Sequence, residues 1–142
     1  MRKSAFLLLL YIMTGYSSIA QSKDESEVRA LLELQTKEWN AGNIPAFMNT
    51  YWKSDSLMFI GKTGITYGWQ KTLDNYKKNY PNTVAMGKLQ FELLEVNRLS
   101  TAYFFVVGKW QLTRSIGDIG GIFTLLLRKV ANRWLIVADH SS

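Results

Sequence analysis

The sequence contains no cysteine and only one histidine, His140. Without cysteine the chain forms neither a disulfide nor a thiolate metal site, so its stability must come from packing. One histidine and no acidic loop with ligand spacing predict no metal site and no cofactor. The sequence also has no Gly-x-Ser-x-Gly motif, and the glycines at 117–121 read as a turn between strands rather than a phosphate-binding loop.

Positive charge is in excess but is not concentrated. Lys and Arg number 17 against 11 Asp and Glu, which gives a formal net charge of +6. The basic residues are dispersed along the chain, whereas a nucleic-acid site needs them gathered on one face. We therefore expect solvated surface charge and no nucleic-acid partner.

The first twenty residues have the layout of a secretory signal peptide. Arg2 and Lys3 precede an apolar run over 5–13, and the small-residue pattern at 18–20 suits signal peptidase. The apolar run is well short of the roughly 20 residues that span a bilayer, so we expect cleavage after Ala20 and no stable membrane anchor. This predicts a secreted or periplasmic protein with a single domain over 21–142.

Hydrophobic spacing predicts three helices. Apolar residues recur at three- and four-residue spacing behind a capping box at Ser22 and Glu25, which is typical of an amphipathic helix. Gly42 can close that helix, and Pro81 stands where the third must stop. The predicted helices are Asp24–Ala41, a short helix from Asn43 through about Tyr51, and Trp69–Tyr80.

The rest of the chain reads as strands. Two short runs, 57–60 and 65–67, flank a Gly-Lys-Thr-Gly turn and predict a β-hairpin. Four longer strands are predicted at about Ala85–Asn97, Thr101–Arg114, Gly121–Val130 and Arg133–Ser142. This order predicts an α+β fold with helices on one face of a curved antiparallel sheet.

Three stretches, Glu38–Gly64, Tyr67–Tyr80 and the ending RWLIVADHSS, carry a family resemblance in their order and spacing. The chain resembles the nuclear transport factor two-like superfamily, and within it the SnoaL-like branch of small exported domains of unknown function. The resemblance implies a cone: a strongly curved antiparallel sheet wraps around a long N-terminal helix, with two further helices and a pocket. It also implies a homodimer, which the excess of apolar residues over 89–107 and 121–130 favours independently.

Alternation along the last strand assigns its side chains to two faces. Trp134, Ile136, Ala138 and His140 share one face, whose apolar character marks it as the interior, and Asp139 falls on the other. Adjacent residues of a regular strand point apart, so Asp139 and His140 are not a catalytic pair with each other. We expect His140 inside the cone and Asp139 outside.

The resemblance also implies where a site would lie. A His near the end of the last strand tends to face the cone, and the matching positions for its partners are Tyr51 and Asp55. Trp39 and Trp110 correspond to apolar walls. His140 could transfer a proton with Tyr51 or Asp55, because imidazole titrates near neutral pH.

Three functions remain open at this point. The first is a domain that binds a small apolar or aromatic molecule, since aromatic residues are abundant and catalytic motifs absent. The second is a cofactor-free lyase, isomerase or hydrolase using His140 with Tyr51 or Asp55. The third is a dimerisation module with a filled cone. Members of the superfamily do all three, so the fold alone does not choose.

Overall fold

The computed structural model describes residues 23–142. The predicted signal peptide (1–20) and the predicted domain start at residue 21 lie outside the described residues. Within this described part, no helix is both long and apolar enough to cross a membrane.

The first helix covers residues 23–40, in agreement with the predicted amphipathic pattern. Its buried residues include Val28, Leu32 and Trp39, which recur at helical spacing and therefore lie on one face. Gly42 follows with a φ of 77°, a left-handed conformation that glycine adopts without a steric penalty. The chain reverses there and enters the next helix.

Three shorter helices follow: α2 (Ile44–Met48), α3 (Trp69–Asn79) and α4 (Thr83–Met86). Asn43 fixes the start of α2, because its side chain accepts a hydrogen bond from the Ala46 backbone N–H at 3.1 Å. α2 ends before the predicted boundary at Tyr51, which instead forms a parallel bridge with Ile136 of the last strand. α4 is too short to give a hydrophobic period and was not predicted.

One curved sheet contains six strands in the order β2-β1-β6-β5-β4-β3. The strands are β1 (Met58–Gly61), β2 (Gly64–Tyr67), β3 (Lys88–Arg98), β4 (Tyr103–Thr113), β5 (Ile119–Val130) and β6 (Arg133–Ser141). The hairpin and the four long strands are present as predicted, except that β3 begins at Lys88, because Ala85 and Met86 belong to α4. The pairing of β1 with β6 is parallel, and it joins the hairpin to the long strands, which the sequence did not predict.

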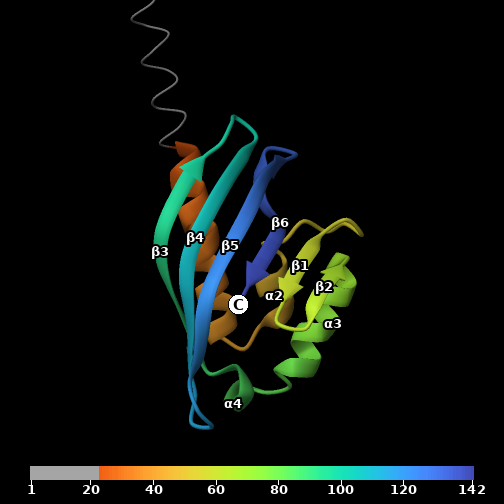
Figure 1. Ribbon diagram of the computed structural model, residues 1–142, viewed down its shortest axis with the longest axis vertical. Helices are drawn as coiled ribbons and strands as arrows, with labels where there is room; N and C mark the ends of the chain where they lie inside the picture. The colour runs from red at the N-terminus through yellow and green to blue at the C-terminus, as the bar shows by residue number, and fades with distance from the viewer. Residues whose placement is uncertain (1–22) are drawn as a thin grey trace, which may run out of the picture.

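The helices lie on one side of the sheet. Figure 1 shows the first helix behind the long strands β3, β4 and β5, with α3 beside the β1–β2 hairpin and α4 below. Buried side chains of the first helix meet inward-facing side chains of the sheet, among them Phe104, Val106 and Leu127. This arrangement confirms the predicted α+β cone with its curved sheet around the first helix.

A β-bulge changes the faces of the last strand. Leu126 of β5 pairs with Ala138, but Leu127 pairs with Ile136, so Val137 is the extra residue. The side chains before the bulge follow the prediction, since Ile136 is fully buried. Beyond the bulge, residues predicted to face the interior face outward, and residues predicted to face outward face the interior.

The predicted orientations at the end of β6 are therefore wrong. Asp139 is only 5% exposed and faces the interior. His140 is exposed on the outer face of the sheet. The residues of β6 before Val137 keep their predicted faces, because the bulge reverses the alternation of side chains only beyond Val137.

Candidate functional site

The cone encloses a cavity of about 550 Å³ between the sheet, the first helix and α3. Its volume lies in the range of pockets that hold small molecules. The β1–β2 turn, residues 61–64, lies on its rim. The cone is therefore not filled by its own side chains.

Aromatic rings form much of the cavity wall. Trp39 on the first helix packs edge-to-face with Phe47, Tyr76 and Tyr80, at centroid distances of 5.1, 5.8 and 4.9 Å. The Trp39 indole N–H donates a hydrogen bond to the Met86 carbonyl at 3.2 Å, which fixes the ring. These contacts give the cavity a rigid aromatic side.

The cavity wall also contains a carboxyl group, because the bulge in β6 turns the side chain of Asp139 inward. The Tyr51 hydroxyl donates a hydrogen bond to Asp139 Oδ2 at 2.7 Å. The Ser141 hydroxyl donates to Asp139 Oδ1 at 2.9 Å. Tyr51 is positioned by the segment after α2, where its bridge to Ile136 holds the backbone against β6.

The environment of Asp139 makes its neutral form more favourable than it is for an aspartate in water. Burial raises the pKa of Asp139 to about 6, although the hydrogen bonds from Tyr51 and Ser141 and the charge of His140 act to lower it. Asp139 takes part in none of the ion pairs found over residues 23–142. At neutral pH the group is mostly a carboxylate, held in a low-dielectric wall without a buried ion-pair partner in the described part of the chain.

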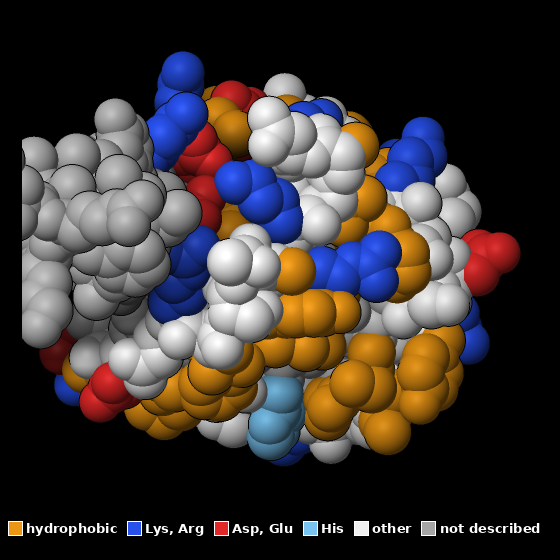
Figure 2. Space-filling view, turned by 90° about the horizontal axis from the view of Figure 1, so that it is seen from above, with side chains coloured by type: hydrophobic (Ala, Val, Ile, Leu, Met, Phe, Trp, Pro, Cys, Tyr) orange, Lys and Arg blue, Asp and Glu red, His pale blue; other side chains and the backbone are white. Residues whose placement is uncertain are grey.

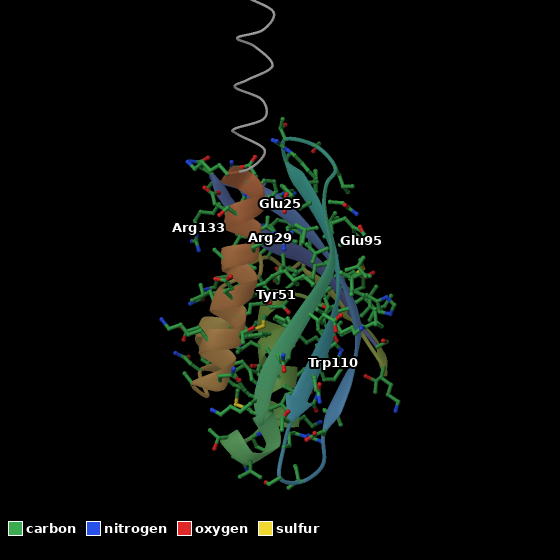
Figure 3. All side chains as sticks on the ribbon, turned by 90° about the vertical axis from the view of Figure 1, so that its left-hand side faces the viewer. Glu25, Arg29, Tyr51, Glu95, Trp110 and Arg133 are labelled. Atoms are coloured by element: carbon green, nitrogen blue, oxygen red, sulfur yellow. The ribbon has the colours of Figure 1, made fainter. Side chains whose placement is uncertain are left out.

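The two tyrosines near Asp139 stay protonated. Burial raises the pKa of Tyr51 and of Tyr76 well above the ordinary value, and the negative charge of Asp139 raises both further. Each phenol is therefore a hydrogen-bond donor at any pH near neutrality. Figure 3 places Tyr51 in the layer between the first helix and the sheet.

The predicted site residues divide into two groups. Trp39, Tyr51 and Trp110 line the cavity, whereas His140 and Asp55 are exposed and do not. The predicted combination of His140 with Tyr51 or Asp55 is therefore not brought together. Proton transfer by His140 inside the cone is a prediction that the bulge overturns.

The central residue of the site, Asp139, was assigned to the outer face by alternation. No local signal in RWLIVADHSS marks a bulge, because its residues suit a regular strand equally well. The pairing of Asp139 with Leu125 of β5 and with Phe59 of β1 fixes its orientation. Phe59 lies far away in the sequence, whereas Leu125 lies across the short turn between β5 and β6.

Trp110 adds an unpaired donor to the wall. Its side chain lines the cavity from β4, and its buried indole N–H has no hydrogen-bond partner in the described structure. An unpaired buried donor costs free energy.

Metal chemistry finds no support in the side chains. Among residues 23–142, no group of three or more His, Cys, Asp or Glu side chains could hold a metal ion. The polar side chains of the wall are the Asp139 carboxyl group, several hydroxyls, the amides of Gln35, Asn75 and Asn79, and Lys62 on the rim. Such groups bind through hydrogen bonds or exchange protons.

Comparison with known proteins gives structural relatives. No protein-family model and no curated protein matches the chain. A solved NTF-2 like protein of unknown function from Shewanella oneidensis MR-1 is 41% identical, with a TM-score of 0.80 over 82% of this chain and 97% of that one.

More distant structures share the fold. A nuclear transport factor 2 (NTF2-like) superfamily protein from Salmonella enterica serovar Typhimurium LT2 is 17% identical, with a TM-score of 0.68 over 86% of this chain and 92% of that one. A ketosteroid isomerase-like protein from Erwinia carotovora atroseptica SCRI1043 is 20% identical, with a TM-score of 0.65 over 82% and 93%. At 41% identity over nearly the whole of the Shewanella protein, the chain belongs to the nuclear transport factor two-like superfamily.

Proposed function

We propose that the chain binds a small, largely apolar or aromatic molecule inside the cone. The observation that carries this proposal is the cavity of about 550 Å³, walled by aromatic rings but containing the Asp139 carboxyl group. Apolar walls with a few placed polar groups are typical of small-molecule sites. In a dimerisation module without a ligand, side chains would be expected to fill the interior of the cone, whereas here the cavity is open.

Native mass spectrometry tests the proposal directly. Protein purified gently from the exporting host is expected to carry a bound small molecule, which denaturation releases. Leu125→Trp fills the cavity wall next to Asp139 and should abolish this mass difference. Glu33→Trp is the control, because it adds the same side chain at an exposed position of the first helix, away from both the cavity and the outer face of the sheet. A ligand retained in Leu125→Trp would place binding elsewhere.

A second candidate function is cofactor-free proton transfer by Asp139. The observation in its favour is a carboxyl group with its pKa raised to about 6 by burial and a hydrogen bond from Tyr51. A base of that pKa can remove a proton from a carbon acid, and a protonated tyrosine can stabilise the oxyanion that forms. Deuterium exchange next to the carbonyl of a bound ketone, lost in Asp139→Asn, would support an isomerase or lyase.

We further propose a homodimer through the outer face of the sheet. Phe105 and Val107 of β4 and Leu126 of β5 are only half-buried there, and Ile122 is 44% exposed. In Figure 2 the pale-blue side chain, the single histidine of the chain, lies between two groups of hydrophobic side chains. Apolar surface of this kind on a sheet is typical of an interface.

Sedimentation tests the dimer. The wild-type protein should sediment as a dimer at micromolar concentration, and Leu126→Asp should sediment as a monomer because a carboxylate cannot be buried there without a partner. Lys71→Asp, at an exposed position of α3 away from the outer face of the sheet, is the control. A wild-type monomer would overturn the proposal.

Export remains a proposal that rests on residues 1–20. N-terminal sequencing of protein recovered outside the cytoplasm should begin at Gln21, the residue after the predicted cleavage site. Membrane-bound material with an intact Met1 would contradict it.

A further inference from the structure

We propose that the ligand of the cavity is an organic cation, an aromatic molecule with a protonated amine whose ammonium group binds Asp139. This inference rests on the proposed binding function and names the chemical class of the ligand. It follows from the charges on the cavity wall and from the rings around the carboxylate.

The cavity wall contains a negative charge without a buried counter-charge. Among the described side chains that line the cavity, Asp139 and Lys62 are the charged ones. Lys62 is exposed on the β1–β2 turn and forms no ion pair with Asp139. The hydrogen-bond partners of Asp139, Tyr51 and Ser141, are neutral hydroxyls. A buried carboxylate that lacks a cation is costly, and a ligand ammonium would offset that cost.

Aromatic rings close to the carboxylate favour the same ligand. Phe59 pairs with Asp139 across β1 and β6, and its ring lies 5.7 Å from that of Tyr76. Phe47 contacts both Tyr51 and Tyr76, at centroid distances of 5.8 and 5.3 Å. Ring faces attract cations, most strongly where water is excluded. Carboxylate and rings together therefore form a site for an ammonium group on an aromatic skeleton.

The same features disfavour other ligand classes. An aromatic carboxylate would bring a second negative charge close to Asp139, which costs free energy in a low-dielectric cavity. A neutral alcohol can donate a hydrogen bond to Asp139 but provides no counter-charge. Hydrogen bonds to charged groups are worth more when the donor is also charged, so the amine gains most.

Binding of an ammonium ligand should depend on pH through Asp139. The titratable and charged groups around it are few: Tyr51 in the segment before β1, Tyr76 on α3, Lys62 on the rim, and His140 on β6 but on the opposite face. Its pairing partners on β1 and β5 are apolar. Both tyrosines stay protonated because their pKa values lie well above neutrality. Asp139 is therefore the inward-facing group expected to titrate near neutral pH.

Titration calorimetry with three matched probes tests the proposal: naphthylmethylamine, naphthylmethanol and naphthoate share one ring system and differ in charge. At about pH 7.5 the amine should bind about tenfold to a hundredfold more tightly than the alcohol, and naphthoate most weakly. Asp139→Asn should bring the amine down to the affinity of the alcohol, whose own affinity should change less than about threefold. His140→Asn, on the outer face, should leave the order unchanged.

The pH profile gives a test that does not depend on a variant. Below about pH 6 the affinity of the wild-type protein for the amine should fall by about tenfold per pH unit, while that for the alcohol stays level. A flat profile for the amine would overturn the proposal even if Asp139→Asn fails to fold.

The outcomes separate this inference from the function on which it rests. If naphthylmethanol or naphthoate binds as tightly as the amine, the cavity binds small molecules but does not select cations. If none of the three probes binds at millimolar concentration, the binding function itself is wrong and the inference fails with it.

Discussion

Two aspartates with nearly equal exposure have opposite surroundings. Asp24 on the first helix is 6% exposed, and Asp139 on β6 is 5% exposed. Asp24 accepts hydrogen bonds from Lys129 at 2.8 Å, Arg98 at 3.0 Å and the Trp134 indole at 3.3 Å. Among the hydrogen bonds of residues 23–142, Asp139 has two partners, the neutral hydroxyls of Tyr51 and Ser141.

The pKa values of the two groups move in opposite directions. Burial acts to raise the pKa of Asp24, but hydrogen bonds from Lys129 and Trp134 and the charges of Lys129 and Arg98 outweigh it and lower that pKa. For Asp139 burial prevails, and the pKa rises to about 6. The charge of Asp24 is thus used within the fold, because it ties the first helix to β3, β5 and β6.

The comparison teaches what each charge is for. A paired carboxylate that joins four elements stabilises the folded state, whereas an unpaired carboxylate in a cavity wall works against it. Proteins commonly accept such a cost at functional sites. Asp139 is therefore the stronger candidate for function, and the following experiments measure the difference.

The largest effect is expected from Asp24→Asn. Arg98 and Lys129 would lose their counter-charge, and we expect the free energy of unfolding to fall by about 3 kcal/mol. Urea unfolding followed by tryptophan fluorescence measures this loss. Glu25→Gln is the control, because its pair with Arg29 is solvent-exposed and worth at most about 0.5 kcal/mol. If the free energy of unfolding falls equally in the two variants, Asp24 does not have the structural role inferred from its ion pairs.

The opposite sign is expected at the second aspartate. At about pH 7.5, Asp139→Asn should raise the free energy of unfolding by up to about 2 kcal/mol, because the amide removes a buried charge and still accepts from Tyr51. The same urea titration measures it. A clear loss of stability would mean that the Asp139 carboxylate stabilises the folded state, as Asp24 does, and that the two aspartates do not differ in this respect.

Acidification should stabilise the wild-type protein relative to Asp139→Asn. The folded pKa of Asp139, about 6, lies above its unfolded value, so the folded state binds a proton that the unfolded state has lost. The stability that protonated Asp139 contributes to the folded state is present at low pH and is lost as pH rises through about 6. Between about pH 7.5 and pH 5 we expect a relative gain of about 1 kcal/mol. Parallel pH dependence of the two proteins would show that Asp139 does not titrate there.

The smallest effect is expected from His140→Asn. The side chain is exposed on the outer face, so the free energy of unfolding should change by less than about 0.5 kcal/mol and the affinity for naphthylmethylamine by less than about twofold. Thermal unfolding and calorimetry check the two values. A tenfold loss of affinity would restore His140 to the site and displace Asp139.

Much of the cavity wall could be anticipated from the sequence. Trp39 lies on the apolar stripe of a helix, which local periodicity predicts. The place of Trp110 in the wall was implied by the family resemblance, because alternation alone did not decide which face of its strand points inward. Their role in ligand binding, like that of Tyr51, stays a prediction. Asp139 could not be identified in the same way, since strand alternation extended without a break through Val137 assigns it to the wrong face.

The sequence by itself determined the first helix, α2, α3, the hairpin and the long strands, because periodicity and turn residues act over a few neighbouring positions. The tertiary structure decided three features: the parallel pairing of β1 with β6, the bulge at Val137, and the empty space beside Asp139. Each depends on which strands become neighbours and how their hydrogen bonds align. Pairing between strands makes that choice, and in β6 it exchanged the places of Asp139 and His140.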